Sequence, residues 1–145
     1  MNTSPTPAPQ ALRPGAAPGP RKIPTPRVLP ESQAYWTAAD AGQLLLKKCR
    51  TCATVHHYPR DICPHCLSAD TEWLQACGSG TLYSFSTMGK GEAAYTLAFV
   101  SLLEGVTLMT NLVDCDPRTL AIGQALRVVF KPSEGGHAVP MFTPA

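Results

Sequence analysis

The C-terminal half of the chain alternates apolar and polar positions in runs typical of β-strands. Residues 79–87 alternate strictly, which predicts one face made of Thr81, Tyr83, Phe85 and Thr87 and an opposite face made of Leu82, Ser84 and Ser86. Residues 94–103 and 106–113 are two more runs rich in strand-forming residues, and residues 125–131 and 138–142 follow after glycine turns. About five short strands within roughly 70 residues predict a small Greek-key barrel of the OB type.

The two central runs, 94–103 and 106–113, carry apolar side chains on both faces. Glu104-Gly105 between them is a hairpin turn signal. A two-residue turn would pair Phe99 with Thr110 and Val100 with Met109, which places Met109 on the face opposite Phe99. Because a small antiparallel sheet normally leaves one face to water, we expect the outer face to be covered by the rest of the chain or by another protein.

Residues 31–41 predict a short helix that ends at Gly42, with Ser32 as its N-cap. Tyr35 and Trp36 in this helix either pack on the domain or dock on a partner. Residues 43–48 then form a strand that leads toward Cys49. The predicted fold class is therefore mostly β with one short N-terminal helix.

Composition and charge both change near Pro30. Nine of the fifteen prolines lie in the first thirty of 145 residues, together with four bases and no acid, whereas residues 31–145 carry a formal charge of −2. We expect residues 1–30 to be a basic arm that is extended or disordered, because proline removes backbone donors and large apolar residues are few. The chain has no apolar run long enough for a membrane span and no signal-peptide pattern, which favours a cytoplasmic location with reduced cysteines.

Four cysteines form the strongest chemical pattern: Cys49 and Cys52, then, after ten residues, Cys63 and Cys66. Two CxxC pairs at this spacing predict a zinc ribbon, in which each pair lies on a tight turn and four thiolates complete one tetrahedron. Such a closed site leaves no open position for water, so we expect one structural Zn²⁺ ion. Iron in a rubredoxin-like site uses the same ligands and stays open as an alternative. A redox role would need a βαβ context that is not evident.

Other candidate residues near the ribbon receive plainer interpretations. His56, His57 and His65 are expected to be exposed loop histidines, because four cysteines already saturate a tetrahedral ion. Cys77 and Cys115 are expected to be free thiols without a catalytic role. The sequence contains no recognisable catalytic motif, so an autonomous enzyme has no support and no catalytic residue is assigned.

The same residues carry a resemblance to a known family. The chain resembles the zinc-ribbon/OB-fold family of acyl-CoA-associated proteins. The segments that carry the resemblance are Tyr35-Trp36, Leu44 to Cys49, Tyr58-Pro59-Arg60, Cys63-Pro64-His65-Cys66, residues 78–85, Glu104-Gly105-Val106, residues 109–113 and Ile122-Gly123 to Pro140-Met141-Phe142. The resemblance covers residues 31–145. It implies an N-terminal helix over 31–42, a rubredoxin-like zinc ribbon over 43–76 and an OB-fold barrel over 77–145, with the proline-rich basic arm outside the match.

The resemblance also implies a function. Members are small non-catalytic subunits that pair with thiolase-superfamily enzymes (thiolases, acyltransferases or aldolases) or with enoyl-CoA hydratases, and they can help to enclose CoA. Four bases near the ribbon, Lys47, Lys48, Arg50 and Arg60, are candidate contacts for CoA phosphates, or they offset the −2 charge of a four-thiolate zinc site.

The alternative function is single-stranded nucleic-acid binding, which OB barrels and zinc ribbons also serve. Such binders combine a basic groove with stacking aromatic side chains. Residues 78–145 carry four bases against five acids, which disfavours this alternative.

Overall fold

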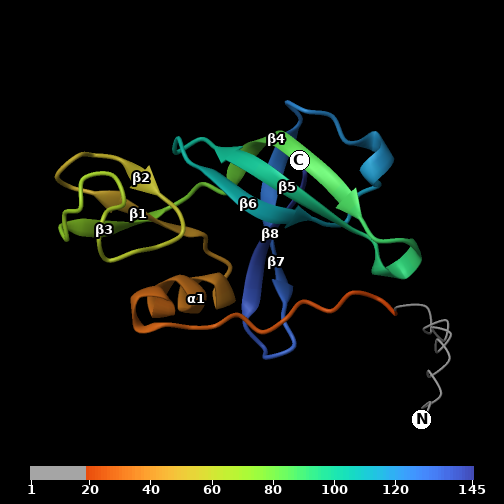
Figure 1. Cartoon of the computed structure of the whole chain (residues 1–145), viewed down its shortest axis with the longest axis horizontal. Helices are drawn as coiled ribbons and strands as arrows, with labels where there is room; N and C mark the ends of the chain where they lie inside the picture. Colours follow the sequence, from red (N-terminus) through yellow and green to blue (C-terminus); the bar gives the residue numbers. More distant parts are fainter. Residues whose placement is uncertain (1–18) are drawn as a thin grey trace, which may run out of the picture.

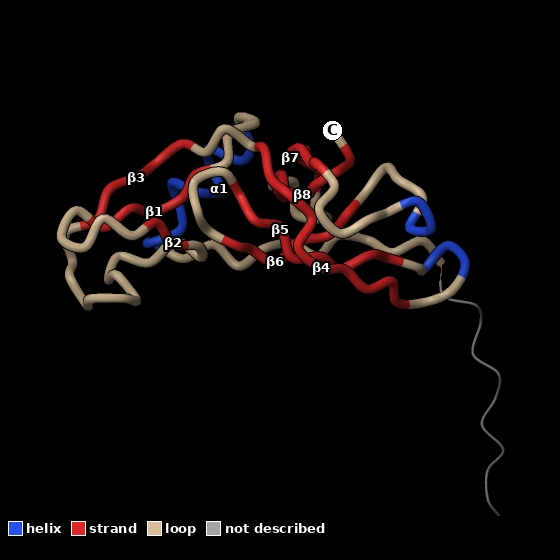
Figure 2. The backbone as a smooth tube through the Cα atoms, turned by 90° about the horizontal axis from the view of Figure 1, so that it is seen from above, coloured by secondary structure: helices blue, strands red, loops and turns tan. Residues whose placement is uncertain are grey.

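Residues 19–145 are described by a computed structural model, in which a three-stranded sheet and a β-barrel lie side by side with a short helix against both (Figure 1). Seen from above, the two β units form an elongated molecule (Figure 2). Most of the proline-rich arm, residues 1–18, lies outside the described residues. The mostly β fold class predicted from the hydrophobic pattern is confirmed. Within residues 19–145, no helix is both long enough and apolar enough to cross a membrane.

The predicted N-terminal helix is present as a 3-10 turn, η1 (Pro30–Ser32), followed by α1 (Gln33–Asp40). Ser32 is the N-cap residue of α1 as predicted, but its side chain makes no capping hydrogen bond to the helix. Its hydroxyl instead accepts from the Leu29 N–H at 3.0 Å and donates to the Leu29 carbonyl at 3.1 Å, because η1 turns the side chain back onto the preceding residue. Tyr35 and Trp36 are buried, so they pack on the chain's own core.

The first β unit is an antiparallel sheet of three short strands, β1 (Leu45–Cys49), β2 (Val55–His56) and β3 (Thr71–Gln75), in the order β2-β1-β3. Its base packs on the rest of the molecule, because Leu44 and Leu46 belong to the same buried cluster as the barrel core. The two cysteine pairs lie at the opposite end of β1, so the metal-binding end projects away from the barrel.

The second β unit is a closed five-stranded barrel made of β4 (Ser79–Met88), β5 (Tyr95–Leu102), β6 (Thr107–Leu112), β7 (Ala125–Pro132) and β8 (Ala138–Pro144). Short 3-10 turns, η2 (Gly91–Ala93) and η3 (Pro117–Thr119), lie in its connections. The strand order is β4-β5-β6-β8-β7, with β6 and β8 parallel and every other pair antiparallel. Leu82, Val100, Leu126 and Phe142 fill the interior. This is the OB-type barrel predicted from the sequence.

The register predicted for the β5–β6 hairpin was wrong by one residue. The turn is a three-residue loop, Leu103 to Gly105, in which Gly105 adopts a φ of 84° that favours glycine. Phe99 therefore pairs with Met109 rather than with Thr110. Because side chains alternate along a strand, the shift moves Met109 to the outer face beside Phe99.

A bulge in β4 corrects a second prediction. The pairing with β5 shifts between Leu82 and Ser84, so that Tyr83 is an extra residue in the ladder. Phe85 then pairs with the buried Ala98 and contributes to the core, whereas Tyr83 stays exposed. The two aromatic side chains expected on one face thus lie on different faces.

The described part of the arm, residues 19–29, packs in extended conformation along the barrel. The Ile23 carbonyl accepts from the Glu134 N–H at 2.9 Å, and Lys22 forms an ion pair with the Glu134 carboxylate at 3.2 Å. The guanidinium of Arg21 lies 3.5 Å from the centre of the Tyr95 ring. Residues 20–24, called the strap below, are thus held against the barrel at several points.

Candidate metal centre and exposed apolar face

The structure brings Cys49, Cys52, Cys63 and Cys66 together, with all four Sγ atoms within 4.8 Å of one another. The Sγ atoms of Cys49 and Cys66 are 3.5 Å apart, and those of Cys52 and Cys63 are 3.7 Å apart. A tetrahedral Zn²⁺ ion with Zn–S bonds of about 2.3 Å requires S–S separations of about 3.8 Å. The donor set and its spacing therefore fit one four-coordinate ion.

The two cysteine pairs sit on turns of the same design. The N–H of Cys49 donates to the Thr54 carbonyl at 3.0 Å, and the N–H of Cys63 donates to the Ser68 carbonyl at 2.9 Å, five residues ahead in each case. The residue after the second cysteine, Ala53 or Leu67, adopts a left-handed φ of 60° or 63°. Non-glycine residues rarely adopt this conformation, and here it turns each backbone around the thiolates.

The thiols also differ in acidity, which is expected where several sulfurs share one space. Hydrogen bonding to the Thr54 hydroxyl and backbone lowers the pKa of Cys52 to about 6. A backbone hydrogen bond at Cys52 lowers the pKa of Cys49. The backbone N–H of Ser68 acts in the same direction on Cys66, but partial desolvation and the three neighbouring sulfurs together outweigh it and raise the pKa of Cys66 to about 12. A divalent cation at the centre would favour the ionised form of all four thiols.

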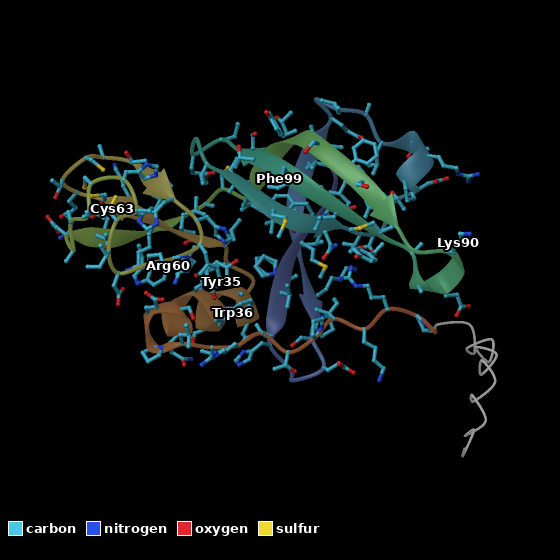
Figure 3. The ribbon with its side chains drawn as sticks, in the orientation of Figure 1. Tyr35, Trp36, Arg60, Cys63, Lys90 and Phe99 are labelled. Carbon is cyan, nitrogen blue, oxygen red and sulfur yellow. The ribbon has the colours of Figure 1, made fainter. Side chains whose placement is uncertain are left out.

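Cys49 and Cys63 are fully buried, whereas Cys52 and Cys66 lie on the surface. The labelled Cys63 lies within the small sheet, far from the labelled barrel residue Phe99 (Figure 3). Four thiolates would leave an ion no free position, so such a centre would hold the two turns together and would not bind substrate.

Only part of the histidine prediction holds. His65 is exposed as expected, but His56 lies on β2 and is only 3% exposed. His57 is partly buried, with its Nε2 atom 3.4 Å from the Tyr35 hydroxyl, and burial lowers its pKa to about 4. The prediction of exposed loop histidines was therefore wrong for His56 and His57, because the segment after the first cysteine pair folds back against β1 and α1.

The four candidate CoA contacts are not gathered on one surface. Lys47 is buried, with its Nζ atom 3.4 Å from the Asp61 carboxylate and 4.2 Å from the centre of the Trp73 ring. Arg50 pairs with Glu72 and Asp70, and Arg60 pairs with Glu31. Lys48 is half-buried and has no ion pair among residues 19–145. Their contact with CoA stays a prediction.

An exposed apolar face covers strands β4, β5 and β6 of the barrel. Tyr83, Phe99 and Met109 are neighbours across the three strands and are 65%, 43% and 61% exposed. Leu103 in the hairpin turn is 75% exposed, and Ile122, next to the Gly123 whose N–H donates to the Leu82 carbonyl, is 72% exposed. We call these five residues the apolar face. The sequence pattern predicted apolar side chains on both faces of the hairpin, but it placed Met109 on the face opposite Phe99.

Comparison with known proteins identifies both β units. The family model described as the ChsH2 rubredoxin-like zinc ribbon domain matches residues 36–72, and the model described as the ChsH2 C-terminal OB-fold domain matches residues 73–131. A DUF35 domain-containing scaffold protein of Methanothermobacter thermautotrophicus is 35% identical over 91 residues, which are 58% of this chain and 68% of that protein.

A probable enoyl-CoA hydratase alpha subunit of Thermomonospora curvata is 32% identical over 143 residues, which cover 94% of this chain. The chain spans only 41% of the length of that relative. A solved structure described as the Ltp2-ChsH2(DUF35) aldolase superposes with a TM-score of 0.74 and 30% identity, covering 83% of this chain and 98% of the matched one. Since the ribbon, the barrel and their order all match, the chain belongs to the ChsH2 (DUF35) family of zinc-ribbon/OB-fold proteins.

Proposed function

We propose that the chain is a non-catalytic, zinc-binding accessory subunit of an acyl-CoA-processing complex. Its partner would be a thiolase-superfamily enzyme (a thiolase, acyltransferase or aldolase) or an enoyl-CoA hydratase. The names of related proteins support this proposal: one is a scaffold protein, one is a hydratase subunit and one is part of an aldolase that contains two named components. The cysteine cluster is consistent with a structural role, because a four-thiolate ion is closed to substrate.

The observation that carries the proposal is the apolar face. Tyr83, Phe99 and Met109 are exposed neighbours across β4, β5 and β6, and Leu103 and Ile122 are exposed in turns that adjoin these strands. The outward-facing positions between and beside them on the β5–β6 ribbon, such as Leu97, Ser101 and Thr107, are also uncharged. A nucleic-acid-binding surface would have lysine and arginine side chains around its aromatic residues. This uncharged surface therefore fits the centre of a protein–protein interface better.

CoA contact is a secondary part of the proposal. Three of the four bases near the ribbon already form ion pairs with carboxylates. Of these four, Lys48 is the one with no ion pair among the described residues, so its charge is available to a phosphate. Binding of CoA to the assembled complex should then weaken in Lys48→Ala. The double variant Lys47→Ala/Arg60→Ala tests whether the paired bases matter as well.

Affinity capture tests the proposed function. The tagged chain, expressed in the organism that encodes it, should retain a protein that mass spectrometry identifies as a thiolase-like enzyme or a hydratase. Met109→Asp should abolish this capture, because it places a charge at the centre of the apolar face.

Ile62→Asp is the matched control, since Ile62 is an exposed apolar residue of the three-stranded unit and is 50% exposed. Recovery of the chain without an acyl-CoA enzyme would contradict the accessory-subunit proposal. Undiminished capture by Met109→Asp would show that the partner binds elsewhere.

A further inference from the structure

A cavity of about 450 Å³ lies between the strap and one end of the barrel. Ile23 and Pro24 of the strap line one side of it, and Val113, Pro117 and Met141 are among the apolar residues that line the other side. The loop that carries Lys90, at the end of the molecule opposite Cys63 in Figure 3, contributes Glu92 to its rim. Its volume is in the range of small-molecule sites, and it is separate from the metal centre.

Most of the polar side chains that line this cavity already have hydrogen-bond or ion-pair partners within the chain, Arg21 and Glu92 being the exceptions among the described residues. The hydroxyls of Thr87 and Thr96 are 2.9 Å apart, and the Asn111 side-chain amide donates to the Thr96 carbonyl at 3.3 Å. The Asp114 carboxylate pairs with Lys131 at 2.6 Å. Among residues 19–145, the buried side-chain polar atoms without a hydrogen-bond partner belong to residues that do not line the cavity. Apart from Arg21 and Glu92, the lining therefore offers a polar ligand few new hydrogen bonds.

The charges around the cavity do not select an ion either. Arg21 is stacked on Tyr95, and Glu92 places an opposite charge in the same lining. With Asp114 already neutralised by Lys131, the lining carries no net charge. Walls with no net charge and several aliphatic side chains favour a hydrocarbon chain over a phosphate or carboxylate.

The cavity adjoins the apolar face. Asn111 of its lining pairs with Leu97 on the outer side of the β5–β6 ribbon, one step along the same face from the Phe99–Met109 pair. A partner seated on the apolar face would therefore lie beside the cavity. A chain that extends from the partner's active site could reach it without crossing the barrel.

From this arrangement we propose that the strap and the end of the barrel form a binding site for an apolar hydrocarbon chain. The acyl group of the thioester handled by the partner is the source we favour, and that choice of source rests on the proposed function. The hydrocarbon site itself belongs to this chain alone, so it can be tested without a partner.

Differential alkylation of the full-length, metal-loaded chain tests the site. Cys115 lines the cavity and is partly buried, whereas Cys77 is exposed and lies outside it. With n-octanol as the probe at ten times its Kd, iodoacetamide should modify Cys115 about tenfold more slowly, since the rate follows the unliganded fraction. The rate at Cys77 should not change. Each thiol is compared with itself at one pH.

A variant and a second measurement keep the result decisive. Ile23→Ser should remove most of the protection by opening the strap side of the cavity, whereas Ile62→Ser on the metal-binding unit should retain it. The methyl group of Met141 should show NMR contacts to n-octanol that the exposed Met109 methyl does not show.

Unchanged Cys115 reactivity together with no contact at Met141 would overturn the site. Three further probes, octanoyl-CoA, octanoate and CoA, test whether the bound hydrocarbon chain is the acyl group of a CoA thioester. Protection by octanoyl-CoA but not by CoA supports the acyl thioester. Protection by n-octanol and octanoate alone keeps the site and rejects that source. Equal protection by CoA and octanoyl-CoA would show recognition of the head group and would refute the hydrocarbon proposal.

Discussion

Replacing Cys63 with Ser should unfold the metal-binding end of the molecule, residues 49–71, and leave the barrel folded. Cys63 is fully buried, and its Sγ atom lies 3.7 Å from that of Cys52. The sheet around it has strands of five, two and five residues, too small to be stable without further support. The buried cluster that fills the barrel comes mainly from the barrel's own strands, with Leu82, Val100 and Phe142 among its members, so we expect the barrel to stay folded without the metal.

The size of the effect follows from the ligand count. A structural zinc ion contributes about 10–16 kcal/mol to the folding of a small metal domain, so one ligand of four corresponds to about 2.5–4 kcal/mol. Whole domains are stable by only about 5–15 kcal/mol, and a part as small as residues 49–71 holds a fraction of that. The loss of one thiolate should therefore exceed the local stability.

Metal content and hydrogen exchange measured by peptide mass spectrometry check this prediction. Cys63→Ser should lose its bound metal, and peptides from residues 49–71 should exchange quickly while those from residues 79–144 stay protected. Cys77→Ser is the matched control, because Cys77 is an exposed cysteine outside the cluster. A Cys63→Ser protein that keeps stoichiometric metal would refute the assigned ligand set. Simultaneous loss of protection in the barrel would refute the independence of the two units.

Three further predictions concern packing, titration and one hydrogen bond. Gly80→Ala should destabilise the chain by about 1–3 kcal/mol in denaturant unfolding, because its Cβ would lie 2.9 Å from a backbone carbonyl oxygen of β5, whereas Gly19→Ala, with open space around it, should be neutral. Hydrogen bonds from Ala138 and His137 lower the pKa of Asp40 in the folded protein below the ordinary value of 3.8. The ionised Asp40 therefore contributes fully to folding stability above pH 3.8, and this contribution is lost as the pH falls through the lowered pKa of the folded state. Asp40→Asn should flatten this acid limb of the stability curve, and an unchanged limb would contradict the assignment. Tyr58→Phe should cost about 1–3 kcal/mol by removing the acceptor of the 3.1 Å hydrogen bond from the Trp36 ring N–H, and the loss should be smaller when Trp36 is already Phe.

Local patterns predicted the elements of this protein because each depends on neighbouring residues. The spacing of Cys49, Cys52, Cys63 and Cys66 predicted one tetrahedral site, since a CxxC turn points both sulfurs to one side. Alternating runs predicted the barrel strands, since side chains on a strand repeat every two residues. The exposed position of His65 also followed from its place between two ligands.

The register of the strand pairs, and the face on which each side chain lies, could not be predicted reliably from the sequence. A hairpin turn of two residues or of three fits Glu104-Gly105 almost equally well, yet the difference of one residue moves Met109 from one face to the other. The bulge at Tyr83 has the same effect on β4, and no local signal marks it. Both shifts enlarge the uncharged apolar surface that supports the proposed function.

The sequence by itself therefore determined the order of the elements, the four sulfur ligands of the candidate site and the presence of apolar side chains on both faces of the central hairpin. Only the tertiary structure decided which side chains form the apolar face, which bases near the ribbon are already paired and where residues 19–29 lie. The physical reason is that proline limits the backbone of the strap but does not choose its contacts. Two of those contacts join residues more than a hundred positions apart, the hydrogen bond from Glu134 to Ile23 and the ion pair of Lys22 with Glu134, and they form only when the barrel has closed.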